Sequence, residues 1–302
     1  MTAPRAGPTQ SARVSEGSEA QVYEEQHAGT KKAAHFGRGS WVMDISTNRP
    51  PTEHALINDF AIRCFRDTGD CDYIAARLAM RARLAGQFMW SAEQALEKYL
   101  KCILMLNRKS TRDLSHDILS ALNRVNDELP FQITLRQPER EVFDHINEWG
   151  ADRYLIFPFH VFDKEVLKLD LLVWRLRQYC VPLDVVHYAD PPSQEILLKN
   201  VARIEAGLLG PAKSGHIGGF LEKVIAKKDH SARAALVWKN ARYCGKSIKY
   251  IRFQNNWQAV NSPLYLKPEL VDEVAKYMKL SKEVVRTAHD LAAERACAGT
   301  KP

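Results

Sequence analysis

The sequence has no C-x-x-C pair, although six cysteines occur among its 302 residues, at positions 64, 71, 102, 180, 244 and 297. Structural zinc sites and disulfide frameworks normally show closely or regularly spaced cysteines, so the wide separation argues against both. Free cysteine is among the most often buried residue types. Cys102 and Cys180 fall on apolar faces of predicted helices. We therefore expect these two thiols to lie in a hydrophobic core.

Long apolar runs and phosphate-binding loops are also missing. No window reaches eighteen uninterrupted apolar residues, so we expect no membrane-spanning helix. The first twenty residues contain basic side chains but no apolar h-region, so no secretory signal is expected and the predicted location is cytoplasmic. The glycines of G-H-I-G-G at 215–219 are not followed by G-K-S/T, which argues against a P-loop.

Composition divides the chain into three parts. Residues 1–50 are rich in Ala, Gly, Ser, Thr, Gln and charge and show no apolar period, so this segment is predicted to be disordered. Met43 precedes a more apolar stretch and is an alternative start. The whole chain is 45% hydrophobic and 26% charged, which is enough apolar material for a core. We predict an all-α protein, with a helical bundle at 55–182 and a basic helical extension at 190–297.

The strongest periodic signal lies in residues 72–107, where apolar residues recur at every third or fourth position. The stretch contains no proline and one glycine, Gly86. It predicts one long amphipathic helix, or two nearly collinear ones, of roughly 54 Å at about 1.5 Å per residue. Antiparallel partners must cover its apolar side. Further helices are predicted at 54–66, 115–125, 138–149, 164–180, 194–206, 220–228, 231–243, 268–279 and 282–296, with a turn at 67–70 and a short strand or extended loop at 246–254.

The same region carries a resemblance to a known family. The run F-M-W-S-A-E-Q-A-L-E-K-Y-L-K-C-I-L-M-L at 88–106, the segment S-H-D-I-L-S-A-L at 115–122 and the later Arg153–Tyr154 pair resemble the core of HEPN domains. These domains are helical modules associated with nucleotides and RNA. The resemblance covers about residues 55–180 and implies an antiparallel HEPN-like bundle around one long helix. It also implies a homodimer and nucleotide contacts by His116, Lys98 and Lys101.

The resemblance leaves two functions open. One is a nucleotide- or RNA-binding module or partner subunit, with a nucleotidyltransferase as a candidate partner and a toxin–antitoxin or defence system as a candidate setting. The alternative is a metal-independent endoribonuclease, since the RNase members of the family use an Arg and a His separated by four to six residues. Arg140–His145 and Arg153–His160 fit by count.

Arg153 and His160 rank first as catalytic candidates, because they precede the final bundle helix. Arginine can stabilise a pentacoordinate phosphate while histidine moves a proton, and neither step requires a metal or cofactor, so none is expected. The structural alternative for Arg153 is an ion pair, with Glu97 as a candidate partner. The structural alternative for His116 is a hydrogen-bonding role at a helix start, where the helix dipole favours a neutral ring.

Positive charge is concentrated between positions 223 and 252, where nine basic residues stand against Asp229 alone. This segment therefore carries a net charge of +8, more than the +7 of the whole chain. Aromatic residues are interleaved with the cations, a pattern typical of nucleic-acid binding. The alternative is a solvated helical face whose aromatic side chains are buried. The predicted nucleic-acid contacts are Lys239, Arg242, Lys246, Lys249 and Arg252.

Overall fold

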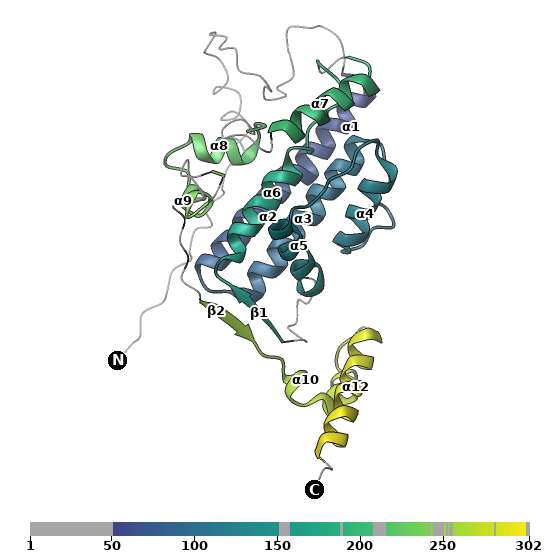
Figure 1. Ribbon diagram of the computed structural model, residues 1–302, viewed down its shortest axis with the longest axis vertical. Helices are drawn as coiled ribbons and strands as arrows, with labels where there is room; N and C mark the ends of the chain where they lie inside the picture. Colours follow the sequence, from purple (N-terminus) through teal and green to yellow (C-terminus); the bar gives the residue numbers. More distant parts are fainter. Residues whose placement is uncertain are drawn as a thin grey trace, which may run out of the picture. The chain divides into compact units, whose positions relative to one another are not determined.

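The computed structural model describes residues 51–150, 158–187, 190–207, 216–240, 242–243, 251, 253, 256–280 and 282–299. They belong to one compact unit that runs from Arg38 to Pro302. The segment predicted to be disordered, 1–50, lies outside the described residues. The described part is mainly helical, as the periodicity predicts, and contains one two-stranded antiparallel sheet (Figure 1).

The prediction of one long helix, or of two nearly collinear ones, at 72–107 is wrong. Helix α2 (Thr68–Arg81) and helix α3 (Ala85–Leu106) form an antiparallel hairpin instead, and they lie side by side in Figure 1. The chain reverses at 82–84, where Arg83 has a φ of 65° that a right-handed helix cannot contain. Both helices bury apolar side chains, so the helical period continues across the turn and does not reveal the reversal.

The region predicted to be a turn before Cys71 is also helical. Helix α1 (Glu53–Ala61) continues into a π-helical segment η2 (Ile62–Asp67) and then into α2. Gly69 lies inside α2, where an added Cβ would sit 3.3 Å from the Cβ of Lys98 and 3.3 Å from the ring of Tyr99. The glycine therefore permits close packing of α2 against α3 rather than a turn.

The helices predicted between 115 and 206 are confirmed, with shifts of up to three residues at their ends. They are α4 (Ile118–Glu128), α5 (Gln137–Trp149), α6 (Glu165–Arg177) and α7 (Gln194–Gly207). Pro138 lies in the first turn of α5 and Gly150 is its C-cap, in agreement with the positions that these two residue types favour at helix ends. The sequence alone favours Asp113 or Ser115 as the N-cap of α4, and this prediction is wrong. The N-cap is Asp117, which accepts the Ser120 N–H at 2.9 Å.

The sheet occupies positions where no strand was predicted. Strand β1 (Phe159–Phe162) pairs antiparallel with β2 (Trp257–Val260), so that Phe159 lies opposite Val260. Each strand has only four residues, too few for a clear alternating pattern. Most of the predicted strand at 246–254 lies outside the described residues. The helices predicted at 231–243 and 268–279 are wrong in length, because the described residues there form only α9 (Arg233–Val237), and η5 (Pro268–Leu270) with α11 (Val271–Val274). The remaining elements are α8 (Phe220–Ala226), α10 (Pro263–Leu266) and α12 (Lys282–Gly299).

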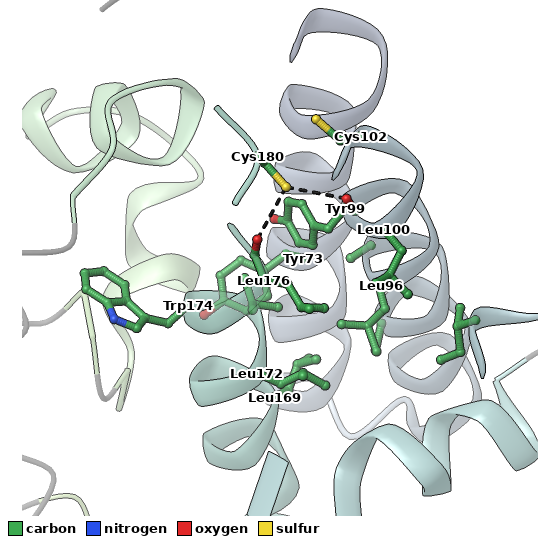
Figure 2. Packing of buried hydrophobic residues seen from close by; sticks show 14 of the residues in the cluster. Tyr73, Leu96, Tyr99, Leu100, Cys102, Leu169, Leu172, Trp174, Leu176 and Cys180 are labelled. Carbon is green, nitrogen blue, oxygen red and sulfur yellow. Dashed lines mark hydrogen bonds between the residues drawn. The ribbon is translucent and has the colours of Figure 1, made fainter. Parts of the chain in front are cut away.

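The hydrophobic core is built around α3. Leu96 and Leu100 of α3 lie near Leu169, Leu172 and Leu176 of α6 (Figure 2). The two thiols predicted to be buried are fully buried, and the Cys180 Sγ donates to the carbonyl oxygens of Tyr99 and Leu176 at 3.5 Å each. Among the described helices, none combines the length and the apolar character needed to cross a bilayer.

A reciprocal set of ion pairs joins α2 to α6. Asp70 and Arg77 stand about two turns apart on α2, and Asp170 and Arg177 stand about two turns apart on α6. Antiparallel packing pairs Arg177 with Asp70, at 2.8 Å, and Arg77 with Asp170. All four side chains are fully buried. We call these four residues the α2–α6 charge interface.

Residues of the extension supply further partners to this interface. Arg77 donates to the carbonyl oxygens of Ala235, at 3.0 Å, and Trp238. Arg177 donates to Glu222 at 2.7 Å and to the Tyr243 hydroxyl at 3.4 Å. Because buried polar groups are costly unless they are hydrogen-bonded, these contacts make the described part of 216–243 a structural cover of the bundle.

Candidate functional site

Two histidines meet in a groove between α5 and β1. His145 lies on α5 and His160 lies on β1, and their ring centroids are 6.1 Å apart. Both line a groove of about 410 Å³, together with Glu165 at the start of α6. The groove thus brings together the histidines of both Arg/His pairs identified in the sequence.

Glu165 fixes the orientation of His145. The His145 Nδ1 lies 2.8 Å from the Glu165 Oε2, and the other carboxylate oxygen of Glu165 accepts the Phe162 N–H at 3.0 Å. An ionised carboxylate only accepts hydrogen bonds, so Nδ1 donates and Nε2 becomes the acceptor of the neutral ring. Glu165 is buried, whereas His145 keeps part of its ring exposed. The arrangement suits an imidazole that removes a proton.

The position of His160 follows from the pleat of β1. Phe159 and Val161 are buried, so the intervening His160 points to the exposed side of the strand. Its ring packs edge to face on Phe162, with centroids 5.2 Å apart and planes at 88°. The aromatic contact and the pairing of His160 with Ala259 of β2 hold this imidazole beside His145.

The groove lining contains two lysines, Lys164 and Lys168, beside the carboxylates of Glu141, Glu148 and Glu165. The Lys164 Nζ lies 5.5 Å from the centroid of the Phe162 ring, and Lys168 forms an ion pair with Glu141. The hydrogen bond from Lys168 lowers the pKa of Glu141. Ammonium groups of this kind can neutralise a phosphate oxygen close to the two imidazoles.

The structure does not place either candidate arginine in the groove. Arg153 lies outside the described residues. Arg140 is exposed, pairs with Asp144 at 3.4 Å and is not among the described residues that line the groove. Its guanidinium carbon lies 5.7 Å from the centroid of the Phe143 ring.

A second cluster contains two of the three predicted nucleotide contacts. The His116 Nδ1 lies 2.9 Å from the Glu97 Oε2, and the Lys101 ammonium donates to the other oxygen of Glu97 and to the Ser115 carbonyl at 3.0 Å. Glu97 therefore joins His116 to Lys101. Lys98 lies apart from this cluster, because its ammonium pairs with Asp72 of α2.

The same cluster is the group of described residues that could hold a metal ion. Glu93, Glu97 and His116 each offer a donor atom, and these atoms lie within 4.8 Å of one another. Carboxylate oxygen and imidazole nitrogen are suitable ligands for a divalent cation. The expectation of no metal came from cysteine spacing and from a metal-independent Arg/His mechanism, and neither gives information about sites made of Glu and His.

The described cations of the basic segment differ in exposure. Lys239 is exposed, and its ammonium lies 5.7 Å from the Trp238 ring centroid and 4.6 Å from that of Phe253. Arg242 is half-buried against Trp174, and Tyr243 belongs to the core. Lys246, Lys249 and Arg252 lie outside the described residues.

Comparison with family models, curated proteins and solved structures finds no match to this chain. The likeness to HEPN domains therefore rests on the segments at 88–106 and 115–122 and on the Arg153–Tyr154 pair. Glu165 was missed from the sequence. Its position at the start of a helix was visible there, but its contact with His145 depends on how α5 packs against α6.

Proposed function

We propose that this protein binds RNA in the groove between α5 and β1 and cleaves it there without a metal. The observation that carries the proposal is the pairing of His145 with Glu165 at 2.8 Å, with the ring of His160 at 6.1 Å in the same groove. One oriented base and one nearby acid are the groups that transesterification of an RNA phosphodiester requires.

The reaction assigns one proton transfer to each histidine. Neutral His145 takes the proton of the ribose 2′-hydroxyl through Nε2, and the resulting oxyanion attacks the adjacent phosphorus. Protonated His160 gives its proton to the leaving 5′-oxygen as the P–O bond breaks. The products are a 2′,3′-cyclic phosphate and a 5′-hydroxyl, and Lys164 offsets part of the charge on the phosphate oxygens.

RNA affinity comes from cations outside the groove. Lys239, Arg242, Lys246, Lys249 and Arg252 remain the proposed backbone contacts, since neutralising phosphates releases counterions and favours binding. A homodimer is part of the proposal, because HEPN domains, the family that the sequence resembles, form their sites between two copies. Of the pair Arg153–His160 predicted from the sequence, the proposal keeps His160. His145 takes the place of Arg153 as the catalytic partner of His160.

The test is cleavage of a single-stranded RNA by the purified full chain in EDTA. His145→Ala and His160→Ala should each lower the rate by about 10² to 10⁴, the range typical of a lost general acid or base. Rate against pH should be bell-shaped in the wild type and lose one limb in each variant. His289→Ala is a matched control, because His289 also pairs with a carboxylate, Asp272 at 3.0 Å, but lies on α12.

Three results would contradict the proposal. They are absence of cleavage by the wild type, dependence of cleavage on added metal, and an equal loss of rate in His289→Ala. A substrate with 2′-deoxyribose at the cleavage position should be inert, because it lacks the attacking hydroxyl.

A second candidate function is nucleotide binding by a partner subunit, favoured by the contacts that Glu97 makes to His116 and Lys101. The candidate setting is a complex with a nucleotidyltransferase, in a toxin–antitoxin or defence system. Calorimetric titration with a nucleoside triphosphate should show binding that His116→Ala and Lys101→Ala weaken. Lys98→Ala is the control, since Lys98 pairs with Asp72 instead. Nucleotide binding without RNA cleavage would favour this candidate over the first.

A further inference from the structure

Arg175 and Glu139 form an ion pair where α5 begins and α6 nears its end, with Arg136 and Arg242 in its electrostatic neighbourhood. The Arg175 Nε donates to the Glu139 Oε2 at 2.5 Å, and the same oxygen accepts the Arg136 backbone N–H at 2.8 Å. Arg136, Glu139 and Arg175 are also electrostatic neighbours of Arg242. We call Arg136, Arg175 and Arg242 the arginine triad. Among the groups that act on the charge of Arg242, Glu139 is the carboxylate and Arg136 and Arg175 are the cations.

Two members of the triad have unused hydrogen-bond donors. The Nε of Arg242 is buried and has no hydrogen-bond partner. Within the described part of the chain, no hydrogen bond or ion pair engages the rest of the Arg242 guanidinium or the Arg136 guanidinium. Arg136 is exposed, whereas Arg175 is buried with Glu139. Buried donors are normally satisfied, so Arg242 is able to bind an acceptor that a ligand supplies.

Trp174 holds Arg242 in position. The guanidinium carbon of Arg242 lies 5.3 Å from the centroid of the Trp174 ring. Trp174 projects from α6 away from Leu96 and Leu100 (Figure 2) and is itself held by ring contacts to His216 and Tyr243 at 5.6 and 5.4 Å. A guanidinium held against an aromatic ring keeps donors available at its edge and is already immobilised before a ligand binds.

The electrostatic surroundings of Arg242 also favour a bound anion. Burial, and next the nearby Arg136, lower the pKa of Arg242, while Glu139 opposes and Arg175 adds to this effect. An anion between these groups would relieve the repulsion among the three guanidinium groups and satisfy the free donors.

We propose that the arginine triad is a binding site for a phosphate group of a nucleic acid or nucleotide. Guanidinium groups match phosphate because their planar donors form two parallel hydrogen bonds to its oxygens. The described lining of the groove between α5 and β1 includes none of the three arginines. The triad is therefore a separate site, and it stands whether or not that groove cleaves RNA.

The test measures binding of a short single-stranded 2′-O-methyl oligonucleotide by fluorescence anisotropy, so that cleavage cannot interfere. Arg242→Gln should weaken binding about tenfold or more, as expected for a lost hydrogen bond between charged groups. The slope of log K against log[salt] should become shallower by about 0.7, the value for one phosphate contact on a single strand. Arg242→Lys should keep the slope but lose affinity, since an ammonium lacks the planar fork.

Lys228→Gln is the matched control. It also removes one positive charge from the basic segment, but Lys228 is exposed and does not belong to the triad. Its effect on affinity should be less than about twofold, because one exposed charge contributes little. Melting temperatures identify any variant that fails to fold. If Arg242→Gln does, Arg136→Gln replaces it, because Arg136 is exposed and its side chain supports no described contact.

The source of the phosphate is decided by comparing probes with and without a 5′-phosphate, and by competition with inorganic phosphate. Equal losses on both probes indicate a backbone phosphodiester. A loss confined to the 5′-phosphorylated probe, with competition by inorganic phosphate, indicates a terminal phosphate. Either result supports the proposal. It is overturned if Arg242→Gln and Arg136→Gln bind every probe as Lys228→Gln does.

Discussion

The α2–α6 charge interface and the groove between α5 and β1 both contain paired acidic and basic groups, but they differ in how completely these groups are buried. Asp70, Arg77, Asp170 and Arg177 are fully buried, and each arginine has several partners. In the groove, Glu165 is buried while His160 is exposed. Fully satisfied charges fix how two helices pack, whereas partly exposed ones remain able to exchange protons.

The largest expected effect comes from breaking the buried interface. Arg177→Met should lower the free energy of unfolding by about 3 to 5 kcal/mol, because it leaves the Asp70 carboxylate buried without its main cation. Urea unfolding monitored by circular dichroism measures this loss. Arg83→Met is the control, since Arg83 is half exposed and pairs with Asp163 at 2.6 Å, an arrangement that contributes about 1 kcal/mol or less.

A double variant tests whether the loss of stability in Arg177→Met comes from the uncompensated charge of Asp70. Asp70→Leu combined with Arg177→Met removes both charges, so it should be more stable than Arg177→Met alone. If the double variant is no more stable than the single one, the interface depends on the hydrogen bonds of Asp70 to Tyr99 rather than on charge compensation.

A substitution in the groove should affect activity more than stability, unlike one in the buried interface. Glu165→Gln should lower the free energy of unfolding by about 1 kcal/mol, the net contribution of a single hydrogen bond. It should lower the rate of RNA cleavage on the order of 10², since the orientation and tautomer of His145 are then less well defined. Initial cleavage rates measured over a pH series, combined with urea unfolding, give both quantities. A large stability loss with unchanged rate would place Glu165 with the buried interface.

A smaller effect is expected at the start of α4, beside His116. Asp117→Ala should cost about 1 kcal/mol, because the Asp117 carboxylate accepts the Ser120 N–H at 2.9 Å and completes the N-cap. Thermal unfolding measures the loss. Asp113→Ala is the matched control, since Asp113 binds Arg124 on the surface and does not cap the helix. Equal losses would restore Asp113 as a capping residue.

Local patterns in the sequence predicted the helices between 115 and 206 well, but predicted the chain reversals and the lengths of the helices at 231–243 and 268–279 poorly. Pro138 and Gly150 mark the ends of α5 through their own backbone preferences, so they could be recognised directly. The hairpin between α2 and α3 could not, because Arg83 is not a residue type that usually adopts a positive φ. The capping residue of α4 was misplaced because several polar residues precede the helix and any of them could serve.

The candidate sites show the same limit. The spacing of Arg and His in the sequence identified His145 and His160 separately, but only the pairing of β1 with β2 and the packing of α5 place them together. The charge pattern identified Arg242, whereas Arg136 and Arg175 lie far from it in the chain and gave no local signal. The aromatic pattern suggested stacking surfaces, but Tyr243 is buried in the core, where its hydroxyl accepts a hydrogen bond from Arg177.

The smallest effect is a pH dependence of stability at the edge of the buried interface. His216 packs between Trp174 and Tyr243, with Glu222 and Arg177 as its charged neighbours. Burial lowers the pKa of His216 below its ordinary value of 6.5, and Arg177 adds to this shift while Glu222 opposes it. The unfolded chain therefore binds a proton more readily than the folded chain, so stability should decline as the pH falls below about 6.5. His216→Phe removes the titrating group, and its free energy of unfolding should decline less than that of the wild type between pH 7.5 and 5.5. Parallel curves for the two proteins would mean that His216 does not contribute to the pH dependence.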